Sequence, residues 1–277
     1  MPSFTFDDEP AALLYLITLT TGLMDGDAHL ITLAAREGTR SVVTGQSATR
    51  IHPAGASFAS QQYQITVEDN AFLVVLPGPA IPYRGARFYQ RGRVELAPTA
   101  RLLWADIWFA GRYDRGELSE RFVFERIVQD FEVRRAGELV YRDRFRWDGP
   151  WTPAQQKWFF GGELAAASLF VGGPISPSLP DPSPQVHRSV FALDNGEHCV
   201  RWIGSPMHVS NEVARVALHI AGFWTGGPGA RPWLLESSAL SPNHWWMNFP
   251  AAPFAAPEEA NGLAETPPSL MMAAPVL

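Results

Sequence analysis

Short apolar runs alternate with polar turns along the first 150 residues, a pattern typical of β-strands. Three segments repeat one arrangement, in which an apolar–polar–apolar triplet is followed by a polar turn and a second apolar run. They are ITLAAREGTRSVV from Ile31, ITVEDNAFLVV from Ile65 and VELAPTARLLW from Val94. Their starts lie 34 and 29 residues apart, within the range of stacked structural repeats. The pattern predicts a mainly β fold, a layered, solenoid-like stack of short strands.

An alternating hairpin is predicted after the repeats. The segments RFVFERIVQDFEVRR and LVYRDRFRW are joined by a turn at residues 136–138. On the second segment, alternation places Arg142, Arg144 and Arg146 on one face. The other apolar side chains share the opposite face with Asp143, and they are Leu139, Tyr141, Phe145 and Trp147. Asp143 is therefore an acidic group on an otherwise apolar face.

Helices are predicted to be few and to come late, in the C-terminal third of the chain. In WTPAQQKWFF, Thr152 is placed to cap a helix, Pro153 takes its first position and Gln155 completes a capping box. A second helix is predicted in SNEVARVALHIAGFW, with Ser210 as its cap. Its single apolar stripe consists of Val213, Val216, Ala217, Ile220 and Trp224. The GGPISPSLPDPSPQ segment between the two helices has the composition of a loop.

One β-rich domain is expected over residues 1–250, because a chain of this length can form a single large all-β domain. Residues 251–277 are rich in alanine and proline and are expected to be disordered. The SPNHWWMNFP segment at residues 241–250 combines Trp and Phe near this tail. It is interpreted either as a docking peptide or as ordinary core, because aromatic residues are enriched in both.

Charge and cysteine content narrow the class of protein. The net charge of −6 argues against nucleic acid as a partner, and the positive charge is nearly all arginine, since Lys157 is the only lysine. The single cysteine, Cys199, excludes an intrachain disulfide and is compatible with a reducing cytoplasm. Residues 1–10 lack the basic start of a signal peptide, and the run AALLYLITLTTGLM is too short to span a bilayer. A cytoplasmic protein without membrane or nucleic-acid partners is expected.

A carboxylate interrupts the most apolar strand of the sequence, LLWADIWFAGR at residues 102–112. Both faces of this strand are otherwise apolar, so it should be buried. Burying an unpaired carboxylate costs several kcal/mol unless the group takes up a proton. Asp106 and Asp143 therefore need either an arginine partner, with Arg87 and Arg112 as candidates, or a function of their own. The sequence leaves both interpretations open.

Motifs of familiar enzymes are absent from the sequence. It contains no phosphate-binding glycine loop, no G-x-S-x-G elbow and no H-E-x-x-H zinc motif. His198 and Cys199 come nearest to a metal pair, but neighbours on a strand point to opposite faces, which favours a structural role. Asp25 and Asp27 either close a tight turn through backbone hydrogen bonds or present a carboxylate where the chain bends.

Five motifs occur in one order: TTGLMDGD, VVTGQSATRIHP, LPGPAIPYRGARFYQRGRVELAP, LLWADIWFAGRYDRGE and YRDRFRW. Together they resemble the urease accessory protein UreD family, called UreH in some organisms, over roughly residues 12–225. The positions that carry the resemblance are Gly22, Gly26, Asp27, Thr44, Gln46, Ala48, Thr49, Pro77, Pro79, Ile81, Pro82, Gly85, Ala86, Arg87, Gly111, Arg112, Gly116, Glu117 and Arg144.

Four features depart from the family pattern. The chain begins almost at the glycine turn, where the family usually has another β-hairpin first. Thr21 replaces the first glycine of that turn and Arg50 replaces a lysine. From Pro228 onward the sequence does not resemble the family's usual short ending.

The resemblance implies a nickel-insertion chaperone and not an enzyme. Proteins of this family bind the urease apoprotein on one side and the helical accessory protein UreF on the other. UreF in turn holds the GTPase UreG, which carries nickel. The resemblance also implies a layered β fold that encloses a water-filled path, with no permanently bound cofactor and with nickel(II) only in transit.

A nickel path needs oxygen or nitrogen ligands that hold the ion weakly enough to release it. Isolated carboxylates and hydroxyls that face an interior cavity suit this task better than a closed metal site. Strand alternation and the family turn together predict that Asp27, Thr49, Asp106 and Asp143 line the path.

Two rival interpretations remain. The first is a β-solenoid enzyme acting on glycans, which would use two of Asp25, Asp27, Asp106 and Glu117 as acid and base in an open groove. The second is a plain protein–protein adaptor with no metal route, in which the buried acids are only paired with arginine.

Overall fold

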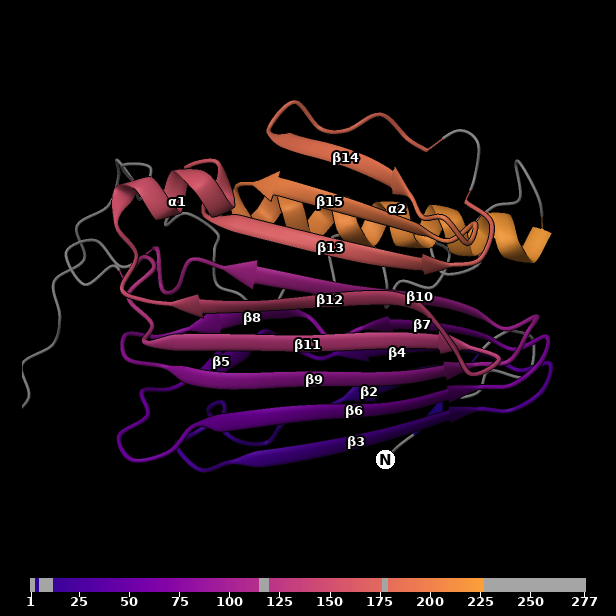
Figure 1. The fold of residues 1–277 in the computed structure, drawn as a ribbon, viewed down its shortest axis with the longest axis horizontal. Coiled ribbons are helices and arrows are strands. Elements are labelled where there is room, and N and C mark those ends of the chain that lie inside the picture. The colour runs from indigo at the N-terminus through magenta and orange to yellow at the C-terminus, as the bar shows by residue number, and fades with distance from the viewer. Residues whose placement is uncertain (1–2, 5–11, 115–119, 176–178, 227–277) are drawn as a thin grey trace, which may run out of the picture.

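Two β-sheets packed face to face form most of the protein, whose structure is a computed structural model. It describes residues 3–4, 12–114, 120–175 and 179–226 (Figure 1). The smaller sheet has the strand order β12-β11-β9-β6-β3, with β3 (Ala28–Ala35), β6 (Ala59–Val67), β9 (Arg87–Leu96), β11 (Arg126–Arg135) and β12 (Glu138–Asp148). The predicted mainly β, layered architecture is confirmed.

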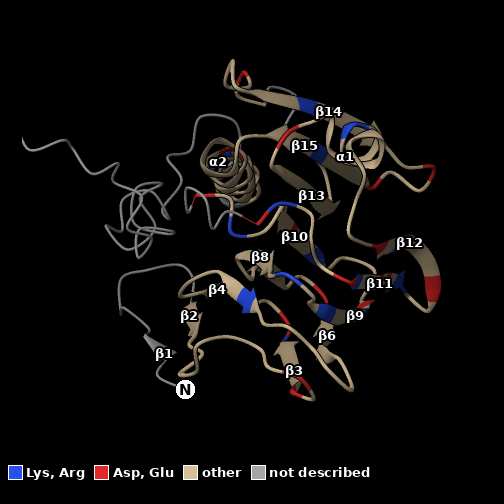
Figure 2. Cartoon of the chain, turned by 90° about the vertical axis from the view of Figure 1, so that its left-hand side faces the viewer, with Lys and Arg blue, Asp and Glu red and all other residues tan. Residues whose placement is uncertain are grey.

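The larger sheet has the order β1-β2-β4-β7-β10-β13-β15-β14, and β8 joins it beside β10 with β5 as a further neighbour. Its strands are β1 (Ser3–Phe4), β2 (Ala12–Leu16), β4 (Arg40–Gly45), β5 (Thr49–Ile51), β7 (Phe72–Leu76), β8 (Pro79–Pro82), β10 (Arg101–Phe109), β13 (Ala165–Gly172), β14 (Val186–Ala192) and β15 (His198–Gly204). Viewed along the strands in Figure 2, the two sheets lie side by side near β6 and β4 and diverge beyond β10 and β11.

Each sequence repeat supplies one strand to each sheet. β3, β6 and β9 run parallel in the smaller sheet, and β4, β7 and β10 run parallel in the larger one. Leu33 pairs with Ile65, and Ile65 pairs with Val94. The structural spacings are therefore 32 and 29 residues, so the predicted first spacing of 34 was wrong by two. Ile31, taken from the sequence as the first repeat start, pairs instead with Tyr63.

Polar side chains link the stacked turns that connect the sheets. Asp69 accepts hydrogen bonds from the amide and the hydroxyl of Thr99 in the next turn, at 3.1 and 2.7 Å. Glu68 accepts from the guanidinium of Arg36 in the preceding turn at 2.7 Å. These contacts join successive turns, as strand pairing joins the sheets, and they explain the polar residues found at this place in every repeat.

Two helices pack against the sheets. Helix α1 (Pro153–Phe160) begins with the predicted capping box, in which Thr152 and Gln155 bond each other reciprocally. Helix α2 (Pro206–Gly226) begins four residues before the predicted cap, and the Ser210 hydroxyl donates to the Pro206 carbonyl within the helix. The predicted apolar stripe of α2 packs on the outer face of the larger sheet. Among the described residues, neither helix has the length and apolar character needed to cross a bilayer.

The space between the sheets holds two apolar clusters with a polar layer between them. Trp104 of β10 belongs to the cluster nearest the polar turns, and Trp108 belongs to the cluster at the opposite end. Asp106 lies between these two tryptophans on the same face of the strand. The buried acid identified in the sequence is therefore at the boundary between two halves of the core.

Candidate functional site

Asp106 is held by three neutral hydrogen-bond donors. Its side chain is only 6% exposed. Oδ1 accepts from Nε2 of Gln90 at 2.5 Å, and Oδ2 accepts from Nε1 of Trp104 at 2.6 Å and from Nε2 of Gln129 at 3.2 Å. Burial raises the pKa of Asp106 to about 7, although these hydrogen bonds act in the opposite direction. The nearby charge of Asp143 raises the same pKa further.

The two arginines proposed as partners of Asp106 bind other acids. Arg87 pairs with Glu125 at 2.7 Å. Arg112 makes two contacts with Glu120, at 2.6 and 3.1 Å. The arginine-paired interpretation is therefore wrong for Asp106, whose carboxylate keeps only neutral partners among the described residues.

The glutamines that bind Asp106 belong to a polar row across the smaller sheet. His29 of β3 pairs in register with Gln61 of β6, Gln61 with Gln90 of β9, and Gln90 with Gln129 of β11. Side chains at paired positions point to the same face of a sheet. This face is the interior one, because Gln90 and Gln129 contact Asp106 of the opposite sheet.

A second polar row continues from Asp106 across the larger sheet. Asp106 pairs with Ser168 of β13, Ser168 with Arg201 of β15, and Arg201 with Ser189 of β14. The guanidinium of Arg201 reaches Asp143 of β12 at 3.2 Å. The two rows meet at Asp106, and we refer to them together with Thr49 and Asp143 as the polar track.

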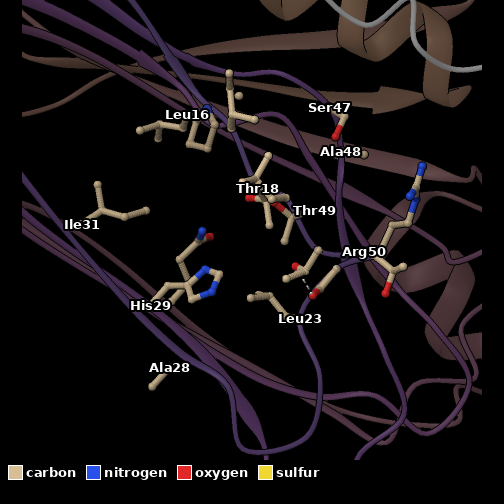
Figure 3. Close-up of a pocket in the computed structure, with 18 of the residues that line it drawn as sticks. Leu16, Thr18, Leu23, Ala28, His29, Ile31, Ser47, Ala48, Thr49 and Arg50 are labelled. Carbon is tan, nitrogen blue, oxygen red and sulfur yellow. Dashed lines mark hydrogen bonds between the residues drawn. The ribbon is translucent and has the colours of Figure 1, made fainter. Parts of the chain in front are cut away.

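Three cavities lie along the polar track. The first, of about 580 Å³, contains His29, Thr49 and Gln61 in its wall. Figure 3 shows His29 and Thr49 extending into it from opposite walls. A central cavity of about 10 Å³ shares Thr49 and Gln61 with the first and is completed by Gln90 and Asp106. Its size corresponds to about one water molecule.

The third cavity is an open cleft of about 460 Å³ at the far end of the track. It shares Trp108 with the central cavity and contains Asp143, Ser168, Ser189 and Arg201. We call it the aromatic cleft, because Trp108, Phe145, Trp147, Phe159 and Phe191 line it. A line of polar side chains thus connects one cavity mouth to the other through a buried carboxylate.

The four residues predicted to line a path are only partly brought together. Thr49 borders both the first and the central cavity, and Asp106 lines the central one. Asp143 lines the aromatic cleft, but its carboxylate is paired with Arg201 and also accepts from the Tyr141 hydroxyl at 3.4 Å. The arginine-paired interpretation therefore applies to Asp143.

Asp27 lies outside the polar track, contrary to its predicted place on an interior path. Its Oδ2 accepts from the Met24 amide at 2.8 Å, which closes the turn, and it lines none of the three cavities. Asp25 accepts from the amides of residues 55–57 at 3.0 Å. The amides of Ala56 and Gly55 hold the pKa of Asp25 below its usual range. The turn interpretation is therefore confirmed for Asp27, whereas Asp25 does not close its own turn but joins it to the separate loop at residues 55–57.

Most family-motif residues support the backbone around the track. Gly22 and Gly111 have φ angles of 143° and 131°, and a Cβ at either position would collide with a carbonyl, of Arg50 or of Glu120. The other family-motif positions that were predicted to bind partners lie in turns, in buried contacts or at the surface. Those that the structure describes are Gly26, Thr44, Gln46, Pro77, Pro79, Gly85, Ala86, Arg87, Arg112 and Arg144. Gly116, Glu117 and the segments 241–250 and 251–277 lie outside the described residues.

The glutamines of the track were missed from the sequence. His29, Gln61 and Gln90 are 32 and 29 residues apart and so occupy equivalent positions in successive repeats. The predicted spacing of 34 residues hid this relation for the first pair. An alignment of the repeats on Leu33, four residues after His29, would have shown a polar residue at one interior position in all three repeats.

Comparisons with known proteins agree with the motif resemblance. A family model described as UreD urease accessory protein matches residues 2–246. The chain is 30% identical over 223 residues to "Urease accessory protein UreH" of Helicobacter pylori, covering 77% of this chain and 82% of that relative. It is 37% identical over 122 residues to "Urease accessory protein UreD 3" of Methylorubrum populi, covering 44% of this chain and 39% of that relative. It is also 37% identical over 142 residues to "Urease accessory protein UreD" of Natronomonas pharaonis, covering 50% and 46%.

The length of these matches differs among the relatives. The matched part spans less than half of the Methylorubrum and Natronomonas proteins, but about four fifths of the Helicobacter protein.

Proposed function

The chain belongs to the UreD urease accessory protein family, and we propose that it acts in urease maturation as a nickel-insertion chaperone that is not itself an enzyme. In this proposal the polar track carries nickel(II) between the first cavity and the aromatic cleft. The observation that carries the proposal is Asp106, a buried carboxylate with neutral partners only.

A carboxylate that is held by neutral donors keeps its charge available for a cation, whereas an arginine-paired carboxylate does not. Nickel(II) accepts oxygen and nitrogen ligands, which the track supplies as carboxylate, amide, hydroxyl and imidazole groups. No three His, Cys, Asp or Glu side chains of the described residues lie close enough together to hold a metal. Positions with few ligands bind an ion weakly, which suits an ion that must move on.

The two ends of the proposed route differ in chemistry. The first cavity offers the His29 imidazole and the Thr49 hydroxyl. In the aromatic cleft, Asp143 is already bound to Arg201. Arg201 therefore competes with nickel for the carboxylate of Asp143, and we place the slowest step of the route there.

The proposed partners are the urease apoprotein, a UreF-like helical accessory protein and, through it, the GTPase UreG. The relatives are named urease accessory proteins, which supports the urease part of this assembly. The sequence contains no phosphate-binding loop, which fits GTP hydrolysis by a partner. The single cysteine fits the proposed cytoplasmic location.

One observation favours the adaptor alternative over the nickel route. Asp143 and Arg201 form an ion pair at the cleft, as expected if the acids only stabilise the fold.

The glycan-enzyme alternative has less support. Asp25 and Asp27 are bound to backbone amides, and Asp106 is buried, so no described pair of these acids flanks an open groove.

Reconstituted urease activation with the full chain tests the proposal. Asp106→Asn removes the charge while keeping the side-chain shape, so nickel per urease should fall by about tenfold or more with the complex still assembled. Asp130→Asn is the matched control, since Asp130 is also buried but pairs with Arg93 away from the track. Wild-type nickel loading by Asp106→Asn would support the adaptor instead.

A further inference from the structure

The outer face of the smaller sheet carries charged side chains in rows. No described helix or strand lies over β9, β11 and β12 on the side that faces the viewer in Figure 1. Gln129 contacts Asp106 in the interior, so its neighbour Asp130 points outward. Two rows of paired positions share this outer face, and they are Arg91–Asp130–Arg144 and Arg93–Glu132–Arg142. We call these six residues the arginine face.

Arginine dominates the accessible charge of the arginine face. The side chains of Asp130 and Glu132 are only 11% and 13% exposed, whereas that of Arg142 is 43% exposed. Arg91 and Arg144 are exposed as well. The two rows contain four arginines and two acids, so this surface is positive, although the chain as a whole carries −6.

The carboxylate of Asp130 is already bound by arginines of the same face. It pairs with Arg93 at 2.8 Å and with Arg142 at 3.4 Å. Burial raises the pKa of Asp130, but these two arginines and Arg144 outweigh burial and hold the pKa below its usual value. Asp130 therefore stays ionised at neutral pH, and its single charge is shared among three arginines. Positive charge is left over on this face.

Arg91 and Arg144 remain available to a ligand from outside. Neither forms a salt bridge with a described residue, and the second acid, Glu132, pairs with Arg134 of its own strand at 2.9 Å. The two arginines flank Asp130 in one row, two strand spacings or roughly 10 Å apart. A guanidinium group can bind a carboxylate through two parallel hydrogen bonds. The pair therefore suits a ligand that presents two carboxylates at about this separation.

The acids between the arginines restrict the kind of ligand. Asp130 and Glu132 form a central column on β11, with an arginine column on either side. An evenly charged polyanion, such as a nucleic acid or an anionic lipid surface, would bring negative charge over this column, where like charges repel. A folded protein can instead present carboxylates to the two arginine columns and a neutral or basic strip between them. The charge pattern therefore favours a protein surface.

We propose that the arginine face binds an acidic surface of a partner protein, in which two carboxylates roughly 10 Å apart bind Arg91 and Arg144. The partner presents a neutral or basic strip to Asp130. The inference goes beyond the proposed nickel route, because docking here needs neither nickel nor any residue of the polar track.

Binding of patterned peptides to the full chain tests this inference. The probe is an alanine-rich helix of about 20 residues with two pairs of Glu on one face, spaced by seven residues or about 10.5 Å. A control peptide has the same composition with its Glu scattered around the helix. At low salt the patterned peptide should bind about tenfold more tightly than the scattered one, since several exposed ion pairs act together. Equal binding of the two peptides would overturn the proposal.

Matched variants locate the binding. Arg91→Gln combined with Arg144→Gln should bind the patterned peptide about tenfold more weakly than wild type. Arg40→Gln combined with Arg121→Gln removes two exposed arginines outside the arginine face and should bind it like wild type. Asp106→Asn should also bind it like wild type, so that failure of docking and failure of the nickel route are distinguishable. Equal affinities for the two double variants would overturn the proposal.

Three further outcomes would overturn the proposal by naming another occupant. Tighter binding of an oligo-dT strand or of phosphatidylserine vesicles than of the patterned peptide, at the same salt, would assign the arginine face to a polyanion. Peptide binding that strengthens when residues 227–277 are removed would assign it to the chain's own C-terminal segment. Self-association of the full chain that the patterned peptide dissolves would assign it to a second copy.

Discussion

The amide nitrogen of Gln90 donates to Oδ1 of Asp106 at 2.5 Å, from one sheet of the protein to the other. This hydrogen bond joins the polar row of the smaller sheet to that of the larger sheet. Since the donor is neutral, a proton on the carboxyl group can pass to water, and the carboxylate that remains can bind an arriving cation. Position and chemistry therefore make Asp106 the central residue of the proposed route.

Asp106 should make folding stability depend on pH in an unusual direction. Its pKa in the folded protein is about 7, above the ordinary value of about 3.9 for an unfolded chain. The folded state therefore binds more protons between these values, and stability falls as pH rises through this window. Asp106→Asn should gain stability over wild type as pH rises from 5 to 8, by about 2–3 kcal/mol. Urea denaturation at the two pH values measures the difference.

Asp130→Asn is the control with the opposite sign. Burial raises the pKa of Asp130, but Arg93, together with Arg142 and Arg144, outweighs this effect and holds the pKa below its usual value. This carboxylate stabilises the fold above its unfolded pKa, and the contribution is lost as pH falls. Asp130→Asn should therefore be less stable than wild type at neutral pH, with the difference shrinking in acid. If the stability difference from wild type changed with pH in the same direction in Asp106→Asn and Asp130→Asn, the environments assigned to these two acids would be contradicted.

The glutamine row should matter for nickel delivery, because it borders the cavities beside Asp106. Gln61→Leu removes an amide that borders both the first and the central cavity. We expect it to slow nickel loading of urease by about tenfold in reconstituted activation. Gln62→Leu is the matched control, since Gln62 is adjacent and points to the opposite face. Equal rates of nickel loading with the two variants would show that the glutamine row takes no part in nickel delivery.

Gly111 should tolerate no side chain. Its φ of 131° is unfavourable for other residues, and an added Cβ would lie 2.5 Å from the Glu120 carbonyl oxygen. Gly111→Ala should lower the free energy of unfolding by about 2–4 kcal/mol. Gly137→Ala shares the positive φ, at 84°, but meets no atom within 4 Å and should cost about 1 kcal/mol. Chemical denaturation of both variants separates the clash from the backbone preference.

The ion pair between Arg112 and Glu120 should be stronger than the one between Arg36 and Glu68. Glu120 is buried and receives two hydrogen bonds from Arg112, which also lies over the Tyr83 ring at 4.2 Å. Arg112→Ala leaves this buried charge poorly paired and should cost about 3 kcal/mol of stability. Arg36→Ala breaks the exposed pair with Glu68 and should cost about 1 kcal/mol or less. Similar losses in thermal denaturation would contradict the burial of Glu120.

Local patterns made much of the fold predictable. The two-residue period identified the strands of the repeats and the β11–β12 hairpin. The capping box of Thr152 and Gln155 fixed the start of α1, because capping depends on neighbours in the chain. The start of α2 was misplaced, because Ser210 resembles a cap but bonds back to Pro206 inside the helix.

The site was less predictable than the fold. Alternation correctly placed Asp106 on an interior strand, but its partners come from the opposite sheet. Which side chains meet between two sheets depends on their packing, which no single-strand pattern records. For the same reason, the pairing of Asp143 with Arg201, 58 residues away along the chain, followed only from the structure.

The most direct test of the nickel route is the location of nickel inside the full chain. Anomalous diffraction at the nickel edge, from crystals soaked in nickel(II), should show a peak beside the carboxylate of Asp106, and the peak should vanish in Asp106→Asn. Peaks confined to surface histidines, with none between Gln90 and Gln129, would contradict the account.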